Sequence, residues 1–294
     1  MNQENRLWQW SSHVILLLIS LACLFPFVLL IVSSFTNEQS IVREGYSFFP
    51  KSLSLDAYAY LGSRWEEIVR AYGITIFITV VGTTVGVLIT AMLAYPISKP
   101  DMPYRNLVAF LIFFTLLFNG GLVPTYLIYT QVLDMKNTIW ALIVPGLLTN
   151  GFNVMMMRSF YSTSIPAPVI ESANIDGAGE FRTFCSIVFP LSLPILATVG
   201  LFELVLYWND WFNGMVYVTD SKLFSLQNLL NRILMDIQFL ASSNLNAGSL
   251  QSKPMPSETV RMAIAVIGVI PLLIAYPFFQ RFFVKGLVIG AVKG

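Results

Sequence analysis

Charged residues are scarce in this sequence. They make up 11% of the 294 residues, whereas a soluble domain carries about 25%. Hydrophobic residues reach 56%, and the mean hydropathy is +0.70. A chain with so few charges cannot cover a globule of this length with polar surface. The composition therefore excludes a soluble protein and indicates a membrane protein.

Metal and redox chemistry lack their usual ligands as well. The chain has a single histidine, His13, and two cysteines, Cys23 and Cys185. One histidine and two cysteines are too few for the usual metal site of His and Cys ligands. Two cysteines so far apart in the sequence also suggest no disulfide framework. We therefore expect no metal and no cofactor bound by this chain.

A nucleotide-binding loop and a strong net charge are also missing. No G-x-x-x-x-G-K-[ST] run occurs, so the chain has no phosphate-cradling loop of its own. The formal net charge of +1 gives no long-range attraction for nucleic acid.

Long apolar runs are what the sequence does contain. Each is close to the roughly 20 residues that a helix needs to cross a bilayer. We expect helices, because an open sheet would leave backbone groups unpaired in lipid. The six runs lie at about 14–35, 72–96, 107–129, 138–157, 192–212 and 262–283.

The segments between the runs predict how the chain crosses the membrane. An even number of spans places both termini on the same side of the membrane. With both termini in the cytoplasm, the cytoplasmic segments carry a weak excess of Lys and Arg, which is the usual orientation. Arg70 and Arg261, beside their helices, argue against this orientation. A cytoplasmic location of the termini makes 36–71 and 213–261 extracellular and 158–190 cytoplasmic, within a single transmembrane domain spanning 1–294.

Two runs carry signals of their own. In the second, Gly82 and Gly86 form a G-x-x-x-G pattern on a small-residue face, which favours close helix packing within the chain over a contact between subunits. The third is interrupted at Asn119, Gly120, Gly121 and Pro124. Such a break is tolerated at membrane depth where protein or a water-filled cavity satisfies the backbone. A pore-lining point and a simple packing kink both fit it.

The segment 158–190 reads RSFYSTSIPAPVIESANIDGAGEFRTFCSIVFP. Its prolines and glycines predict two short helices rather than an irregular connection, with a break at Gly177 and Gly179. In the second helix Phe181, Phe184, Cys185 and Val188 recur at i, i+3, i+4 and i+7, which predicts a single apolar face. A loop of this kind is typical of a docking element.

This loop resembles one shared by the permease subunits of bacterial ABC importers, which reads E-A-A, three residues, G, nine residues, I-x-L-P. The chain departs from that pattern at Ser172 and Phe189. The DGA run, the WND triplet at 208–210 and the NGGLVPTYL stretch resemble the maltose-type carbohydrate permeases, in the branch for polysaccharide-derived oligosaccharides. By this resemblance the residues that couple the loop to an ATPase are Glu171, Ser172, Ala173, Asp176, Gly177, Ala178, Ile187 and Pro190.

The resemblance implies an all-α membrane protein with six spans, the type I importer permease fold, in a bacterial inner or cytoplasmic membrane. It further implies a coupling helix that inserts into a separate ATPase. Glu171 would pair with a basic residue there, and Gly177 would allow a sharp turn with positive φ. The implied partners are a second, unlike permease, an ATPase dimer that uses ATP and Mg²⁺, and an extracellular sugar-binding protein. The chain itself would not be an enzyme.

Polar residues in the fourth and fifth runs are candidates for the substrate path. Ionisable side chains inside a membrane are costly and tend to face a cavity or another helix. The alternatives are hydrogen bonds between helices and an aromatic belt at the membrane surface. With the break in the third run, the candidates are Asn119, Asn150, Asn153, Glu203, Tyr207, Asp210 and Trp211, of which Glu203, Tyr207 and Asp210 stand at i, i+4 and i+7.

Three functions are compatible with these features. The leading one is the permease of an ATP-driven importer for an oligosaccharide. The second is a permease of the same family for a non-sugar solute. The third is an ion-coupled carrier with Glu203 and Asp210 as a proton relay, although such carriers usually show inverted repeats and none is evident here.

Overall fold

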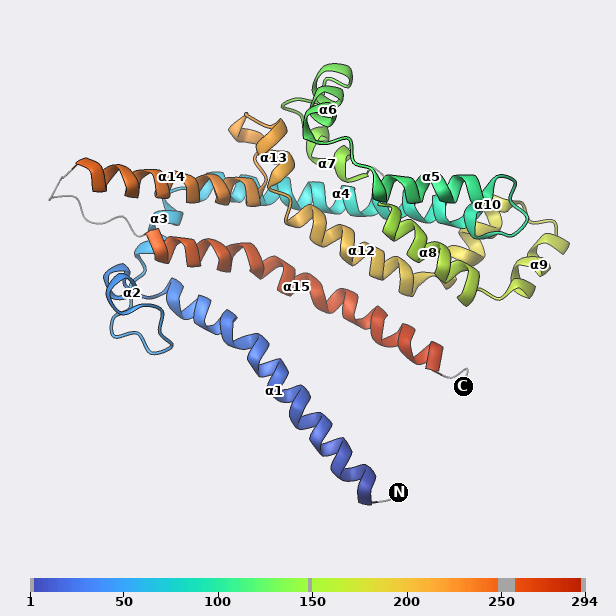
Figure 1. Cartoon of the computed structure of the whole chain (residues 1–294), viewed down its shortest axis with the longest axis horizontal. Helices are drawn as coiled ribbons and strands as arrows, with labels where there is room; N and C mark the ends of the chain where they lie inside the picture. Colours follow the sequence, from blue (N-terminus) through green and yellow to red (C-terminus); the bar gives the residue numbers. More distant parts are fainter. Residues whose placement is uncertain (1–2, 148–149, 248–256, 292–294) are drawn as a thin grey trace. The chain divides into compact units, whose positions relative to one another are not determined.

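The computed structural model describes residues 3–147, 150–247 and 257–291. Within these residues the structure is helical (Figure 1), apart from an isolated β-bridge between Thr36 and Leu53. The two termini, at 1–2 and 292–294, and the stretch 248–256 of the predicted extracellular segment lie outside the described residues.

The chain divides into two compact units. The first comprises Met1–Glu66 and Leu230–Pro271, and the second comprises Glu67–Leu229 and Leu272–Gly294. The elements are α1 (Gln3–Ser34), α2 (Glu38–Glu44), α3 (Asp56–Gly62), α4 (Trp65–Ser98), α5 (Arg105–Leu117), α6 (Leu122–Leu127), η1 (Ile128–Val132), α7 (Trp140–Leu147), α8 (Gly151–Ser164), α9 (Ala167–Ile175), α10 (Glu180–Thr183), η2 (Phe184–Val188), α11 (Phe189–Leu191), α12 (Leu193–Trp208), α13 (Phe212–Tyr217), η3 (Ser221–Leu223), α14 (Leu226–Ala247) and α15 (Ser257–Ala291).

Three of these helices are long and apolar enough to cross a membrane unbroken. They are Trp8–Ser34 within α1, Trp65–Ser98 and Ser257–Pro277 within α15, and they correspond to the first, second and sixth apolar runs. Three bent pairs pass the same test together, so the structure holds three to six candidate spans.

The third run is broken where the sequence predicts. Its pair, α5 with α6 and η1, is bent by 111°, and the residues between Leu117 and Leu122 contain the Asn-Gly-Gly sequence. Gly121 has φ +84, a left-handed conformation that glycine adopts without steric cost.

The fourth run is also bent, and a further bend stands at the start of the fifth; the apolar pattern predicted neither. The fourth is divided into α7 and α8 with a 50° bend, and the second helix continues to Ser164, so it covers the first seven residues of the predicted loop. The fifth, α12, is bent by 81° from Glu180–Leu191. Hydropathy records only how apolar a window is, so it does not reveal changes of direction at helix caps such as Asn150.

In the first unit, the carboxylate of Glu38 caps the N-terminus of α15. Its Oε1 accepts from the backbone N–H of Ser257 (3.0 Å) and Glu258 (2.9 Å), and its Oε2 accepts from that of Thr259 (2.9 Å). The first backbone N–H groups of a helix have no partner within the helix and favour a negative charge. Glu38 therefore ties α2 to α15 across the sequence.

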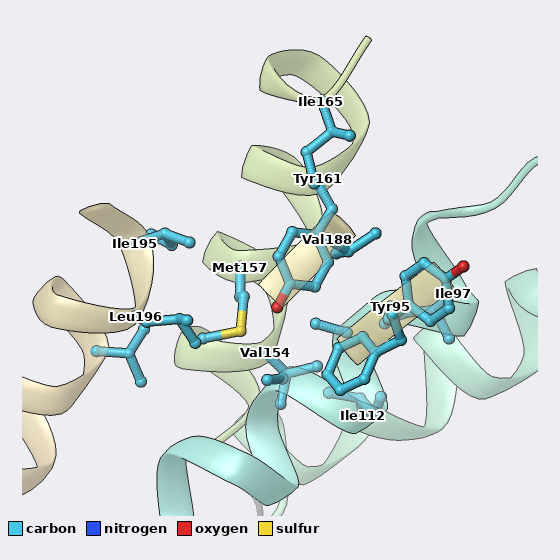
Figure 2. Packing of buried hydrophobic residues seen from close by; sticks show 14 residues of the cluster. Tyr95, Ile97, Ile112, Val154, Met157, Tyr161, Ile165, Val188, Ile195 and Leu196 are labelled. Carbon is cyan, nitrogen blue, oxygen red and sulfur yellow. The ribbon is translucent and has the colours of Figure 1, made fainter. Parts of the chain in front are cut away.

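The larger apolar core of the second unit lies at one end of α4. Tyr95 and Ile97 of α4 pack there with Met157 of α8, Val188 of η2 and Leu196 of α12 (Figure 2). α8, which leads into the segment 158–190, and α12, which follows it, thus contribute to the same core. This core holds the two ends of the segment in place.

Candidate functional site

The predicted coupling loop contains two short helical pieces, as the sequence indicates. The first is α9, and the second is α10 continued by the wider turn η2. On α9 the side chains of Glu171 and Ser172 are exposed, and Ile175 is 85% exposed, whereas Ala173 is buried. The helix therefore presents a mixed polar and apolar surface while its small residue packs inward.

The end of α9 is a Schellman motif built around Gly177. The Ala178 N–H donates to the carbonyl of Ala173 (2.9 Å), and the Gly177 N–H donates to that of Asn174 (3.1 Å). Gly177 has φ +74, the conformation this motif requires and glycine best supplies. The sharp turn with positive φ that the sequence predicts at Gly177 is present, and Asp176 is the residue that caps the helix.

The predicted apolar face of the second helix is half correct. Phe184 and Val188 are buried, but Phe181 is 73% exposed and Cys185 is exposed. The prediction assumed 3.6 residues per turn, whereas residues 184–188 form a π-helical turn, which shifts the register of the side chains. Ile187 is partly buried and Pro190, in α11, is exposed.

A cavity of about 510 Å³ lies beside this second helix. Its lining includes Met92 and Pro96 from the end of α4, Lys99 just after that helix, Glu180 from α10 and Phe184 from η2. Glu180 accepts hydrogen bonds from Tyr95 of α4 and from Lys99, the residue that follows this helix. Sequence reasoning missed this contact, because no local pattern links residues 81 and 85 positions apart.

Side chains from the surrounding segments also donate hydrogen bonds to the backbone at the end of α4. Its last carbonyls lack partners within the helix, as at any C-terminus. Arg158 Nε donates to the carbonyl of Ile97 (3.1 Å), Ser162 Oγ to that of Ser98 (3.4 Å), and Arg105 to that of Lys99 (3.4 Å). Two of these donors come from α8, which leads directly into the coupling loop.

Two of the polar path candidates meet inside the second unit. The Asn153 amide donates to Oε1 of Glu203 (2.8 Å), and both side chains are buried. The second oxygen, Oε2, has no hydrogen-bond partner among the described residues. This is a hydrogen bond between α8 and α12 of the kind that joins helices in membranes.

Tyr207 is enclosed by neighbouring helices. It is 1% exposed, and its hydroxyl donates to the carbonyl of Ile143 in α7 (2.9 Å). Gly82 lies against its ring, and Gly86 lies against the side chain of Glu203. The small-residue face of α4 thus packs against α12 within this chain.

Asp210 does not share a helix face with Glu203 and Tyr207, so that prediction is wrong. α12 ends at Trp208, and Asp210 follows it. Its Oδ1 accepts from the backbone N–H of Asn213 (3.0 Å) and its Oδ2 from the Asn213 amide (2.7 Å). The carboxylate thereby satisfies donors at the start of α13, and the i, i+7 spacing does not apply across the break.

The remaining path candidates are exposed. Asn119 follows α5 and accepts from the Gly121 N–H (2.9 Å), while Asn150 caps α8 by accepting from the Phe152 N–H (3.1 Å). Trp211 is 43% exposed. Among the residues described, no group of three or more His, Cys, Asp or Glu side chains is placed to hold a metal ion.

Comparisons with known proteins agree on one kind of membrane component. Residues 77–289 match a family described as "binding-protein-dependent transport system inner membrane component". Over 291 residues the chain is 37% identical to the polygalacturonan/rhamnogalacturonan transport system permease protein YtcP of Bacillus subtilis, covering 99% of this chain and 100% of that protein. Over 271 residues it is 39% identical to protein LplC of the same organism, covering 92% and 90%.

A solved structure is similar over almost the whole chain. It is a bacterial ABC transporter involved in the import of the acidic polysaccharide alginate. The TM-score is 0.76 at 28% sequence identity, and the match covers 96% of this chain and 99% of that one.

Proposed function

Because the chain belongs to the family of binding-protein-dependent transport system inner membrane components, we propose that it is the permease subunit of an ATP-driven importer for oligosaccharides. The observation that carries this proposal is the similarity over the full length to a permease named for polygalacturonan and rhamnogalacturonan. Resemblance to the alginate importer supports a polysaccharide-derived cargo. Membership of this family argues against the third candidate, the ion-coupled carrier.

The proposal includes the topology. Each bent pair contributes one span, which makes six, with both termini in the cytoplasm. In the last of these pairs the span is α12, and Glu180–Leu191 belongs to the cytoplasmic loop that precedes it. Segments 36–71 and 213–261 are then extracellular, and 158–190 is cytoplasmic. The bends support this count, since each pair passes the length and hydropathy test only when its two helices are joined.

The coupling loop gives the proposed mechanism. α9 enters a groove of the partner ATPase, where Glu171 pairs with a basic side chain and Ala178 keeps the backbone close. Ala173, expected from the sequence to share that role, is buried within this chain instead. When the ATPase dimer closes on ATP and Mg²⁺, α9 moves and the spans alternate between inward-open and outward-open states. The chain catalyses no reaction itself, and the nucleotide and metal belong to the partner.

The proposed transport complex has three further kinds of subunit. A second, unlike permease completes the translocation path, an ATPase dimer provides the energy, and an extracellular sugar-binding protein delivers the cargo. The family description names dependence on a binding protein, which supports the last of these most directly.

The seven polar and aromatic residues of the sequence analysis remain the candidates for the substrate path. Asn119, Asn150 and Trp211 have exposed side chains that could contact sugar hydroxyls or a sugar ring. The other four candidates are less exposed and would support the side chains that line such a path: Asn153, Glu203, Tyr207 and Asp210.

Reconstitution tests the proposal. The chain is inserted into proteoliposomes with its partner permease, ATPase and binding protein, and ATP-dependent uptake is measured for oligogalacturonides, rhamnogalacturonan fragments, arabino-oligosaccharides and alginate fragments. We expect uptake of at least one of these sugars. Uptake of an amino acid, a polyamine or phosphate in their place would favour the second candidate, a permease for a non-sugar solute.

Two substitutions test the coupling loop in the same vesicles. Glu171→Lys reverses the charge that meets the ATPase, and Gly177→Asp strains the turn after α9. Both are expected to reduce uptake and ATP hydrolysis. Unchanged values for both variants would contradict the coupling role.

A further inference from the structure

The coupling helix α9 is connected to the end of α4 on both of its sides. Before it, Arg158 and Ser162 of α8 donate to the carbonyls of Ile97 and Ser98. After it, Glu180 at the start of α10 is bonded to Tyr95 and Lys99. A displacement of α9 therefore reaches α4 through two separate sets of contacts.

The contact after α9 is concentrated on one carboxylate oxygen. Glu180 Oε2 accepts from the Tyr95 hydroxyl (2.9 Å) and from the Lys99 ammonium group. Lys99 Nζ lies 4.9 Å from the centroid of the Tyr95 ring, which adds a cation–π contact. The rings of Tyr95 and Phe184 lie 5.3 Å apart. These four side chains thus form one connected cluster.

The 510 Å³ cavity is lined by residues of this cluster, including Tyr95, Lys99, Glu180 and Phe184. Tyr95 and Phe184 also pack in the apolar core at the end of α4. The bonds of Glu180 add a polar connection at the rim of the cavity to this apolar packing.

We propose that Glu180 is a positioning residue for transport, which through Lys99 and Tyr95 makes the end of α4 move together with the coupling loop. The inference rests on the proposed function of the chain as an importer permease. Lys99 is 17% exposed and Glu180 is 66% exposed, and exposed ion pairs contribute little to stability. Loss of the pair should therefore impair coupling while the protein remains folded.

The matched control is Asp101. Its carboxylate lines the same cavity and is exposed, and no hydrogen bond or ion pair involves it in the described part of the chain. Asp101→Asn and Glu180→Gln remove the same charge from the same rim, and the side chain introduced by Glu180→Gln keeps an oxygen that can accept a hydrogen bond. A difference between the two variants therefore reports the ion pair of Glu180 with Lys99 rather than the local charge.

The first measurement is the ratio of ATP hydrolysed to sugar imported in proteoliposomes that contain the whole transporter. We expect Glu180→Gln and Lys99→Met each to raise this ratio at least threefold, with no further rise when both are combined. Asp101→Asn should match the wild type. The exchanged pair, Glu180→Lys with Lys99→Glu, should bring the ratio back within twofold of the wild type.

The second measurement needs no sugar, so it separates this inference from the identity of the cargo. After Cys23→Ser and Cys185→Ser, spin labels are placed at Ile175→Cys on α9 and Leu88→Cys on α4. In the wild type their distance should stay constant when ATP and vanadate close the ATPase, and in Glu180→Gln it should change.

A Glu180→Gln transporter with a wild-type ratio and a constant label distance would overturn the inference. So would an exchanged pair that stays as uncoupled as either single variant. Failure of the wild type to import any sugar probe would contradict the proposed cargo, and the label distance would still decide the role of Glu180.

Discussion

The ring of Tyr207 lies directly against the backbone of Gly82. A Cβ atom on residue 82 would be 2.4 Å from Cζ of Tyr207, and one on Gly146 of α7 would be 2.8 Å from the same atom. The hydroxyl is also fixed by its bond to Ile143. The ring is thus enclosed between α4 and α7 and cannot move aside.

Gly82→Ala should therefore destabilise the protein by about 1–3 kcal/mol, the usual cost of overpacking. The measurement is thermal unfolding of the purified complex in detergent. Gly73→Ala, in the same helix, is the control, since a Cβ there meets nothing within 4 Å and should leave stability unchanged or slightly higher. Equal unfolding temperatures for the two variants would contradict the packing.

Gly177 offers a test of backbone strain without a steric clash. A Cβ on it meets nothing within 4 Å, but its φ is +74, so a side chain costs roughly 1 kcal/mol or more through conformation alone. Gly177→Ala should lower ATP-driven uptake severalfold, and Gly177→Asn should lower it less, because Asn tolerates this conformation best after Gly.

The matched control for that prediction is Gly179→Ala. Gly179 lies two residues further along in the same turn, with φ −69 and nothing within 4 Å of an added Cβ. We expect uptake at the wild-type level. Equal losses in the Gly177 and Gly179 variants would mean that the turn conformation is not what matters.

The sequence predicts local features of this site well and distant ones poorly. The turn at Gly177 follows from a local preference, and so does the break at Gly121, whose φ is +84. Asp210 was misplaced because periodicity was extended past Trp208, where the helix ends. The bonds of Glu180 to Lys99 depend on tertiary packing, and no spacing in the sequence encodes them.

The helix cap formed by Glu38 should make the stability of the first unit depend on pH. Burial raises the pKa of its carboxyl, but the hydrogen bonds from Glu258, Thr259 and Ser257 outweigh this effect and hold the pKa below its usual value. A depressed folded-state pKa means that the stabilisation is complete above the unfolded pKa of about 4.3. It is lost as pH falls through the folded-state value.

Glu38→Gln should therefore lower stability at pH 7 by about 1–2 kcal/mol, as expected for loss of a charged helix cap. The difference from the wild type should shrink as the pH of the unfolding measurement is lowered from 6 to 3.5. Asp101→Asn, at an exposed position outside the helices, is the control for the loss of one negative charge. A difference that is constant with pH would contradict the capping role.

The bond between Asn153 and Glu203 separates a structural role from a proton relay. Glu203→Gln keeps an oxygen that accepts from the Asn153 amide, so uptake should remain within about twofold, since interhelical bonds of this kind average ~0.6 kcal/mol in membranes. Asn153→Leu leaves the buried carboxyl without the donor on Oε1 and should reduce both stability and uptake. A relay requires a titrating group, so abolition of uptake in Glu203→Gln, with normal assembly of the complex, would show that proton exchange at Glu203 is part of transport.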